Sequence, residues 1–273
     1  MIIHYPIHTV TPFINWVYFF HAWGFQPRYA SIAKLHGCDA CRASWLTTFP
    51  EEERPKAAEA MQLFKEAQRM LNLLDEEYQT HTIYELCAAN SDEDNLILNG
   101  IRLPLLRQQT RKRNDAPFLC LSDFVRPLSS GIQDTVGVFA SCVDAEMETL
   151  FENDAYKKML VQTLSDRLAE ATTEKMHEET GFKGIRPAVG YPSLPDHSVI
   201  FILDEIIKMN QIGIQFTENG MMLPHASTSG LMISHPAATY FSVGKIGEDQ
   251  LEDYARRRGK SIEELKRFLA ANL

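Results

Sequence analysis

The stretch GIRPAVGYPSLPDH, residues 184–197, is unlike the sequence on either side of it and decides how the rest of the fold is interpreted. Pro187, Pro192 and Pro195 each fix φ and remove a backbone donor, so this segment cannot continue a helix or a central strand. A backbone stiffened in this way cannot pair with itself, and we expect its N–H and C=O groups to stay free for a ligand. The segment also carries an arginine, a tyrosine and a histidine. The pattern predicts a stiff, irregular loop that holds a ligand.

The composition is that of an ordinary globular protein. Apolar residues make up 45% of the 273 residues and charged residues 23%. No linker, repeat or low-complexity segment divides the chain, so we expect one domain over residues 1–273. The net charge of −9 argues against nucleic acid or an anionic membrane as the main partner. The apolar run FINWVYFF is too short to span a membrane and follows no basic segment typical of a signal peptide, which favours a cytoplasmic protein.

Hydrophobic periodicity predicts several helices. Apolar side chains recur at three- and four-residue steps in two long segments and again after the proline loop, where Ser198 is expected to cap a shorter helix. Gly259 divides the end of the chain into two helices, the second opening with Ser261 and Glu264 as a capping box. The helices expected before this C-terminal pair cover residues 49–78, 154–179 and 199–207.

Short runs rich in β-branched and aromatic residues predict strands between these helices. They cover residues 82–89, 95–103, 135–143, 212–216, 230–234 and 239–246. Asn99-Gly100 inside the second run is a strong signal for a tight hairpin turn. Helices and hairpin-linked strands are mixed without a regular βαβ alternation. The pattern therefore predicts an α+β domain with a mainly antiparallel twisted sheet and long helices.

The five cysteines are scattered along the chain and do not form a disulfide framework. Cys38 and Cys41 form a CxxC motif behind His36, but no second pair completes the four ligands that zinc requires. A redox-active CxxC is expected to open a helix after a strand, and the surrounding sequence does not indicate one. We therefore expect reduced thiols and no bound metal.

The motifs of common catalytic centres do not occur in this sequence. It contains no GxGxxG turn, no Walker P-loop, no HExxH and no GxSxG elbow. Dinucleotide binding by a Rossmann fold, nucleotide hydrolysis, zinc proteolysis and nucleophile-elbow hydrolysis all lose support. The sequence predicts no catalytic residue, and we expect the chain not to be active alone.

Several motifs together resemble the S-adenosylmethionine-binding activation domain of cobalamin-dependent methionine synthase. The most specific are the proline loop and the segment HPAATYFSVGKIGEDQLEDYARRRGKSIEELKRFLAANL at residues 235–273. The resemblance extends over nearly the whole chain, because four further segments follow the family's order: INWVYFFHAWG (14–24), LLRQQT (105–110), CLSDFV (120–125) and LSDRLAEAT (164–172). In that family the domain is the C-terminal module of a larger enzyme, and here we expect it to stand alone.

The resemblance implies a ligand site around the proline loop. Arg186 would bind the methionyl carboxylate of S-adenosylmethionine, because a guanidinium fork matches a carboxylate, and Ala188 would offer backbone groups to the adenosyl part. Asp123 and Glu170 would face the ammonium and the ribose hydroxyls. Each side chain also has a purely structural alternative: a surface ion pair for Arg186, a turn or cap carboxylate for Asp123, and simple solvation for Glu170.

Three ring-bearing residues complete the implied site. Tyr191 and Tyr240 match family tyrosines, and an electron-rich ring face beside a sulfonium is favourable by about 1 kcal/mol. Both could instead be core aromatics. His197 matches the family's loop histidine, although it could simply cap the following helix.

The sequence departs from the family in three places, one of which, the stretch TENGMMLPHAS, faces the corrin ring in the family. An insert with acidic residues is missing before the proline loop, where the sequence reads HEETGFKGIRP, and SVIF follows His197 in place of Thr-Glu-Lys. In TENGMMLPHAS, residues 221–223 replace bulkier side chains. Ligand binding therefore follows the family more closely than docking onto the corrin does.

The function implied by the resemblance is reductive methylation of cob(II)alamin to methylcobalamin. The family uses S-adenosylmethionine as the methyl donor and a flavodoxin-type protein as the electron donor. The family's Asp-x-His-x-x-Gly cobalamin motif is absent from this sequence, so we expect the cobalamin on a separate chain, a corrinoid-binding methionine synthase or a related methyltransferase. The alternative is a non-catalytic protein that binds S-adenosylmethionine as a sensor or regulator.

Overall fold

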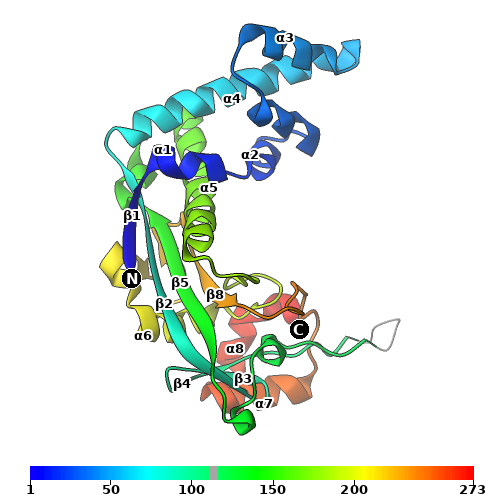
Figure 1. Cartoon of the computed structure of the whole chain (residues 1–273), viewed down its shortest axis with the longest axis vertical. Helices are drawn as coiled ribbons and strands as arrows, with labels where there is room; N and C mark the ends of the chain where they lie inside the picture. Colours follow the sequence, from blue (N-terminus) through cyan, green and yellow to red (C-terminus); the bar gives the residue numbers. More distant parts are fainter. Residues whose placement is uncertain (111–115) are drawn as a thin grey trace.

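A long, curved antiparallel sheet runs through the molecule (Figure 1). The computed structural model describes residues 1–110 and 116–273. The strand order is β4-β3-β2-β5-β8, and β1 pairs with the first half of β2 while β3 pairs with its end. A separate two-stranded sheet pairs β6 with β7. The strands are β1 (Ile2–Pro6), β2 (Gln79–Asp92), β3 (Asn95–Leu98), β4 (Ile101–Pro104), β5 (Asp134–Val143), β6 (Gln215–Phe216), β7 (Met222–Leu223) and β8 (Ser227–Ile233).

Helices cover both faces of this sheet and extend beyond its ends. In Figure 1, α3 and α4 lie at the end of the molecule opposite α7 and α8. Helix α5 packs along the sheet and meets α4, α1 and α2. The helices are α1 (Ile7–Val10), α2 (Trp16–Ala22), α3 (Asp39–Thr47), α4 (Arg54–Asp75), α5 (Ala155–Thr180), α6 (Ile200–Ile207), α7 (Glu248–Arg258) and α8 (Ile262–Phe268).

The central strand β5 shows why the sheet is covered on both sides. Val136, Val138 and Ala140 belong to the cluster that contains the apolar face of α6, whereas Phe139 packs with Met176 of α5. Successive side chains of a strand point to opposite faces, so both sets are buried and the strand is apolar almost throughout.

Buried hydroxyl groups tie α5 to the same sheet. Thr173 donates to Ser141 over 2.9 Å, and Ser141 donates to Thr82 over 2.9 Å. Because an unpaired buried hydroxyl is costly, this chain of hydrogen bonds fixes the position of α5 against β5 and β2. The inner wall of the site described below is therefore a helix held rigidly.

The predicted α+β class is confirmed, and so are most of its elements. Asn99 and Gly100 form the expected hairpin turn with φ of 49° and 88°, in the left-handed region that such turns need. Strand β1 and helices α1 to α3 were not predicted. Three of the predicted details also differ. Residues 239–246 form no strand, and only Gln215–Phe216 of the run 212–216 is a strand. Asp196 rather than Ser198 caps the turn before α6, because its carboxylate accepts the Ser198 N–H over 2.8 Å.

The C-terminal pair of helices is confirmed with one change. Ser261 accepts the Glu264 N–H over 3.1 Å and caps α8 as expected. The Glu264 carboxylate pairs with Lys260 instead of returning to the cap backbone. The capping box is therefore half formed.

Candidate functional site

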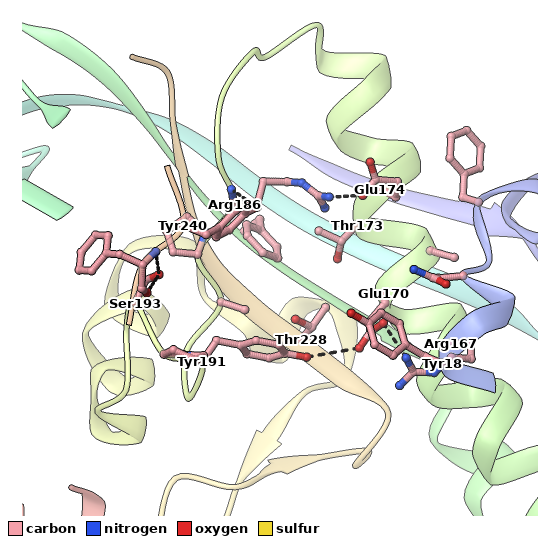
Figure 2. A pocket seen from close by; sticks show the side chains of 18 of the residues that line it. Tyr18, Arg167, Glu170, Thr173, Glu174, Arg186, Tyr191, Ser193, Thr228 and Tyr240 are labelled. Atoms are coloured by element: carbon pink, nitrogen blue, oxygen red, sulfur yellow. Dashed lines mark hydrogen bonds and ion pairs between the residues drawn. The ribbon is translucent and has the colours of Figure 1, made fainter. Parts of the chain in front are cut away.

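A cavity of about 900 Å³ opens between α5, the proline segment and residues 240–242 (Figure 2). The proline segment, residues 184–197, forms one wall, and α5 forms the opposite wall. Tyr18 of α2 and Phe139 of β5 also line the cavity. Segments far apart in the sequence thus meet here because α5 and the proline segment pack on the same sheet.

The proline segment lies along the outer edge of β8 and is not free of backbone pairing. The Ile185 and Ile233 N–H groups donate to each other's carbonyls over 3.0 and 2.9 Å. The Leu231 N–H donates to the Pro187 carbonyl, and the Val189 N–H donates to Ser229. The expectation that this backbone stays free for a ligand is therefore wrong for most of the segment, because proline still offers a carbonyl acceptor to an edge strand. The segment also pairs with itself, since the Gly190, Tyr191 and Leu194 N–H groups donate to carbonyls within it. The alternation of residues that pair with β8 places Arg186 and Ala188 in the cavity wall.

Two glycines allow the segment to approach β8 so closely. A side chain at Gly230 would lie 2.3 Å from the Pro187 carbonyl oxygen, and one at Gly184 would lie 2.0 Å from the Ile233 oxygen. Gly184 also has φ of 150°, which other residues rarely adopt. Glycine at both positions is needed for the edge pairing that carries Arg186.

Arg186 reaches across the cavity to α5 (Figure 2). Its guanidinium pairs with the Glu174 carboxylate, and its backbone N–H donates to the Tyr240 hydroxyl over 2.9 Å. The side chain of Arg186 is 17% exposed and that of Glu174 is 54% exposed. The guanidinium therefore lies largely out of water, against a carboxylate that remains at the cavity mouth.

Glu170 lies one helical turn before Glu174 on the same wall (Figure 2). Arg167 pairs with it over 2.8 Å, and the Tyr191 hydroxyl donates to it over 3.3 Å. Partial burial and the Glu170 carboxylate raise the pKa of Tyr191. Glu170 is thus bound within the site and is not simply solvated.

The two tyrosines predicted to contact the ligand lie at the rim of the cavity (Figure 2). Tyr191 is 55% exposed and Tyr240 is 60% exposed. The alternative that both are core aromatics is therefore wrong. Their exposed ring surface is available to a ligand or to a docked partner.

Asp123 is not among the residues that line this cavity. Its carboxylate accepts two hydrogen bonds of 2.7 Å from Arg107 and one of 2.8 Å from the Cys120 N–H. This is the arrangement of the cap carboxylate that the sequence left open as an alternative. A role of Asp123 in ligand binding stays a prediction.

His197 lies behind the proline segment and outside the cavity lining. A side chain at Gly190 would lie 2.4 Å from its ring, so the ring is in close contact with the turn of the segment. Asp196, not His197, provides the cap for the following turn. The position of His197 indicates packing against the loop, and ligand contact by this residue also stays a prediction.

Glu174 and Arg167 are site residues that sequence reasoning missed. Both lie on α5, and Glu174 follows Glu170 by four residues, which places the two carboxylates on one face of the helix. That spacing was a usable signal. What it could not show was that the proline segment would place Arg186 opposite this face.

Other classes of site receive no support from the part of the chain that the structure describes. Over residues 1–110 and 116–273, no three His, Cys, Asp or Glu side chains are placed so that they could hold a metal ion. Within the same residues, no helix is both long and apolar enough to cross a bilayer.

Two comparisons with known proteins bear on this cavity. The family described as "Vitamin B12 dependent methionine synthase, activation domain" matches residues 6–182 and 179–259. A solved structure, described as "Crystal Structure of the MetH Reactivation Domain bound to AdoHcy", is similar with a TM-score of 0.84 and 32% sequence identity. The similarity covers 100% of this chain and 90% of that one. The family suggested by the sequence motifs is the family found by both comparisons.

Proposed function

Since this chain belongs to the activation-domain family of vitamin B12-dependent methionine synthase, we propose that it binds S-adenosylmethionine in the cavity between α5 and the proline segment. The observation that carries the proposal is Arg186, a mostly buried guanidinium directed into a cavity of about 900 Å³. Within residues 1–110 and 116–273 its guanidinium has a single side-chain partner, Glu174. A site of this volume is large enough for a nucleoside-sized ligand. The similar solved structure holds AdoHcy, which supports the same ligand class here.

The amino-acid end of the ligand fits the Arg186–Glu174 pair. An α-amino acid carries a carboxylate and an ammonium on one carbon. When it binds, the ion pair between Arg186 and Glu174 can be replaced by two ion pairs with the ligand. Its carboxylate takes the guanidinium in a bidentate contact, and Glu174 then takes the ammonium. Glu174 thus fills the role that the sequence predicted for Asp123, whose carboxylate is held by Arg107.

The remaining wall suits the sulfonium and the nucleoside. The exposed faces of Tyr191 and Tyr240 can lie beside the sulfonium, where a cation–π contact contributes about 1 kcal/mol. Glu170 can accept hydrogen bonds from ribose hydroxyls, and the backbone at Ala188 lies at the cavity wall for the adenosyl part. These contacts bind and orient the ligand, and none of them is a catalytic acid or base.

The reaction supported is the reductive methylation of a corrinoid carried on a methionine synthase chain that lacks this domain. Cobalamin on that partner supplies a reduced cobalt that accepts the methyl group, with the electron delivered by a flavodoxin-type protein. Residues of this chain hold the sulfonium at the mouth of the cavity and so fix the direction of the methyl group. Positioning is the contribution that the geometry supports, because the sulfonium is already a good leaving group and needs no general base.

Calorimetric titration with two ligands tests the binding proposal. We expect S-adenosylmethionine to bind, and we expect decarboxylated S-adenosylmethionine, which keeps the sulfonium and the ammonium, to bind on the order of 100-fold more weakly. Equal affinity for the two ligands would show that Arg186 does not hold the carboxylate. Absence of binding by both would remove the assignment to this ligand.

A second experiment tests the reaction in trans. The chain is mixed with a corrinoid methionine synthase lacking its activation domain, a one-electron reductant and S-adenosylmethionine, and the methylcobalamin absorbance is followed. We expect methylation to require this chain. If methylation is equally fast without it for several corrinoid partners while S-adenosylmethionine still binds, the protein is a sensor of that ligand.

A further inference from the structure

Cys38 and Cys41 lie at the start of α3, at the end of the molecule away from α7 and α8 (Figure 1). The expectation that this CxxC motif does not open a helix is wrong: Cys38 is the N-cap of α3, and its sulfur accepts the Cys41 N–H over 3.3 Å. The two sulfurs are 2.9 Å apart. A disulfide bond is about 2.05 Å long, so closing it requires an approach of less than about 1 Å.

The two thiols differ in their surroundings, and Cys38 is the more reactive. Hydrogen bonds from the Cys41 thiol, the Cys41 backbone and the His36 side chain lower the pKa of Cys38 to about 7. The shared hydrogen bond raises the pKa of Cys41. Cys38 is exposed and Cys41 is partly exposed. An accessible thiolate beside a second thiol is the arrangement of a nucleophilic cysteine with its resolving partner.

The other three cysteines provide an internal contrast. Cys87, Cys120 and Cys142 are buried. Burial raises the pKa of Cys87 and of Cys120 to about 11 and that of Cys142 to about 12. They are thiols of the core that solvent oxidants do not reach.

We propose that Cys38 and Cys41 form a thiol–disulfide exchange site that reacts with small-molecule disulfides. The Cys38 thiolate attacks one sulfur of the disulfide, forming a mixed disulfide and releasing the first thiolate. Cys41 then loses its proton and attacks the Cys38 sulfur, which closes the Cys38–Cys41 bond and releases the second thiolate. The two protons lost by the cysteines leave on the two released thiols, so the protein is oxidised by two electrons and the disulfide is reduced by two.

The site is separate from the proposed ligand cavity. No residue of α3 lines that cavity, and α3 packs on α4 through the buried Trp45. Exchange at Cys38 can therefore be measured whether or not S-adenosylmethionine binds, and the two proposals can fail independently.

The test is to incubate the reduced full-length chain with oxidised glutathione and to follow the products by mass spectrometry. We expect a wild-type product that has lost two hydrogens, mapped to the Cys38–Cys41 peptide, with a rate that is half-maximal near pH 7. At pH 7 the reaction should be about threefold faster than that of an ordinary exposed thiol, because the larger thiolate fraction outweighs the lower nucleophilicity of a thiolate of lower pKa.

Two variants separate the roles of the pair. Cys41→Ala should stop at a stable adduct with one glutathione, and its rate should become half-maximal at a higher pH than that of the wild type, because the thiol hydrogen bond to Cys38 is lost while those from the backbone of residue 41 and from His36 remain. Cys38→Ala should abolish the fast phase, with Cys142→Ala as a matched control that leaves it intact. A persistent adduct on the wild-type chain, a product linking two chains, or a rate equal to that of an ordinary thiol would overturn the proposal.

Discussion

Two arginines, Arg107 and Arg186, are both paired with carboxylates but lie in very different surroundings. Arg107 uses its full set of donors: it contacts Asp94, the Phe118 carbonyl and both oxygens of Asp123 at 2.6–2.8 Å. Arg186 has one carboxylate partner, Glu174, among the described residues, although its side chain is more buried, 17% exposed against 30% for Arg107.

The difference indicates which pair is structural and which belongs to a binding site. A guanidinium whose donors are all used stabilises the fold and leaves nothing for a ligand. A guanidinium that is mostly buried and has N–H groups without a protein acceptor is stabilised further when it binds a second anion. This comparison supports a structural role for Arg107 with Asp123 near α7, and it is consistent with the proposal that Arg186 binds a ligand carboxylate.

Replacement of Arg186 by alanine should have the largest effect on ligand binding. We expect the affinity for S-adenosylmethionine to fall by about 2–3 kcal/mol, or about 30- to 150-fold, because a charge-assisted bidentate contact is lost. Decarboxylated S-adenosylmethionine should lose less than about threefold, since it has no carboxylate to be recognised. Calorimetry on both ligands measures the difference. Equal losses for the two would mean that Arg186 acts on the shape of the loop and not on the carboxylate.

Replacement of Arg107 by alanine should lower the stability of the fold and leave ligand affinity nearly unchanged. We expect the free energy of unfolding to fall by about 2 kcal/mol, a value reduced because the pair is about one-third exposed. Ligand affinity should stay within about twofold of the wild type. Denaturant titration and calorimetry provide the two measurements.

Asp123→Asn is the companion to that variant. We expect this variant, too, to have a lower free energy of unfolding and an unchanged ligand affinity, because Asp123 lies outside the cavity lining. A tenfold loss of affinity in folded Asp123→Asn protein would instead establish the ligand contact predicted from the sequence.

The Tyr240 hydroxyl contacts the backbone of Arg186 and not its guanidinium, so its removal should have a smaller effect on ligand affinity. Tyr240→Phe deletes the oxygen that accepts the Arg186 N–H at 2.9 Å and keeps the ring. We expect affinity to fall by about 1 kcal/mol, the contribution of one hydrogen bond. Tyr191→Phe is the matched control, because its hydrogen bond to Glu170 is longer, at 3.3 Å, and should matter less. A larger effect at Tyr191 would contradict this ranking.

The smallest expected effect is a change in proton binding at His177. Burial and the nearby positive charge of Arg186 lower the pKa of His177 in the folded protein. The unfolded chain therefore binds this proton more tightly, and stability is lost as the pH falls from about 6.5 towards the folded pKa.

Ligand binding should partly reverse this shift. A ligand carboxylate on Arg186 offsets the positive charge, so the pKa of His177 should rise when S-adenosylmethionine is bound. NMR titration of the His177 ring measures the change, and Arg186→Ala should abolish it. A fall of the pKa on ligand binding would place the carboxylate elsewhere.

Much of the fold was predictable because local signals and packing agree. The apolar periodicities of α4 and α5 and the Asn99-Gly100 turn each specify a conformation without help from distant residues. The prediction of a strand at residues 239–246 was wrong, because its apolar side chains pack into hydrophobic clusters without belonging to a strand. Phe241 and Val243 pack against neighbouring clusters, while the Phe241 N–H and C=O pair with the Ser193 side chain instead of with a strand.

The candidate site was predictable only in part. The three prolines and the single arginine set the proline segment apart, and its resemblance to the activation-domain family identified it as the ligand loop. Arg186, Ala188, Tyr191 and Tyr240 do meet at the cavity. The sequence suggested Asp123 as a carboxylate of the site and did not indicate Glu174. The spacing of residues along the chain predicts which of them share a helix face. It does not predict which charged side chain of a distant segment will lie opposite that face.

The sequence by itself determined the parts of this protein that depend on short-range sterics: the presence of α4 and α5, the hairpin turn, and a proline segment that can be neither helix nor central strand. Only the tertiary structure decided that the segment docks on the edge of β8 through Gly184 and Gly230, and that Arg186 thereby faces Glu174 while Arg107 takes Asp123. The reason is physical. Ion pairs form over a few ångströms between side chains that the chain separates widely, so the packing of α5 and the loop on one sheet selects the partners.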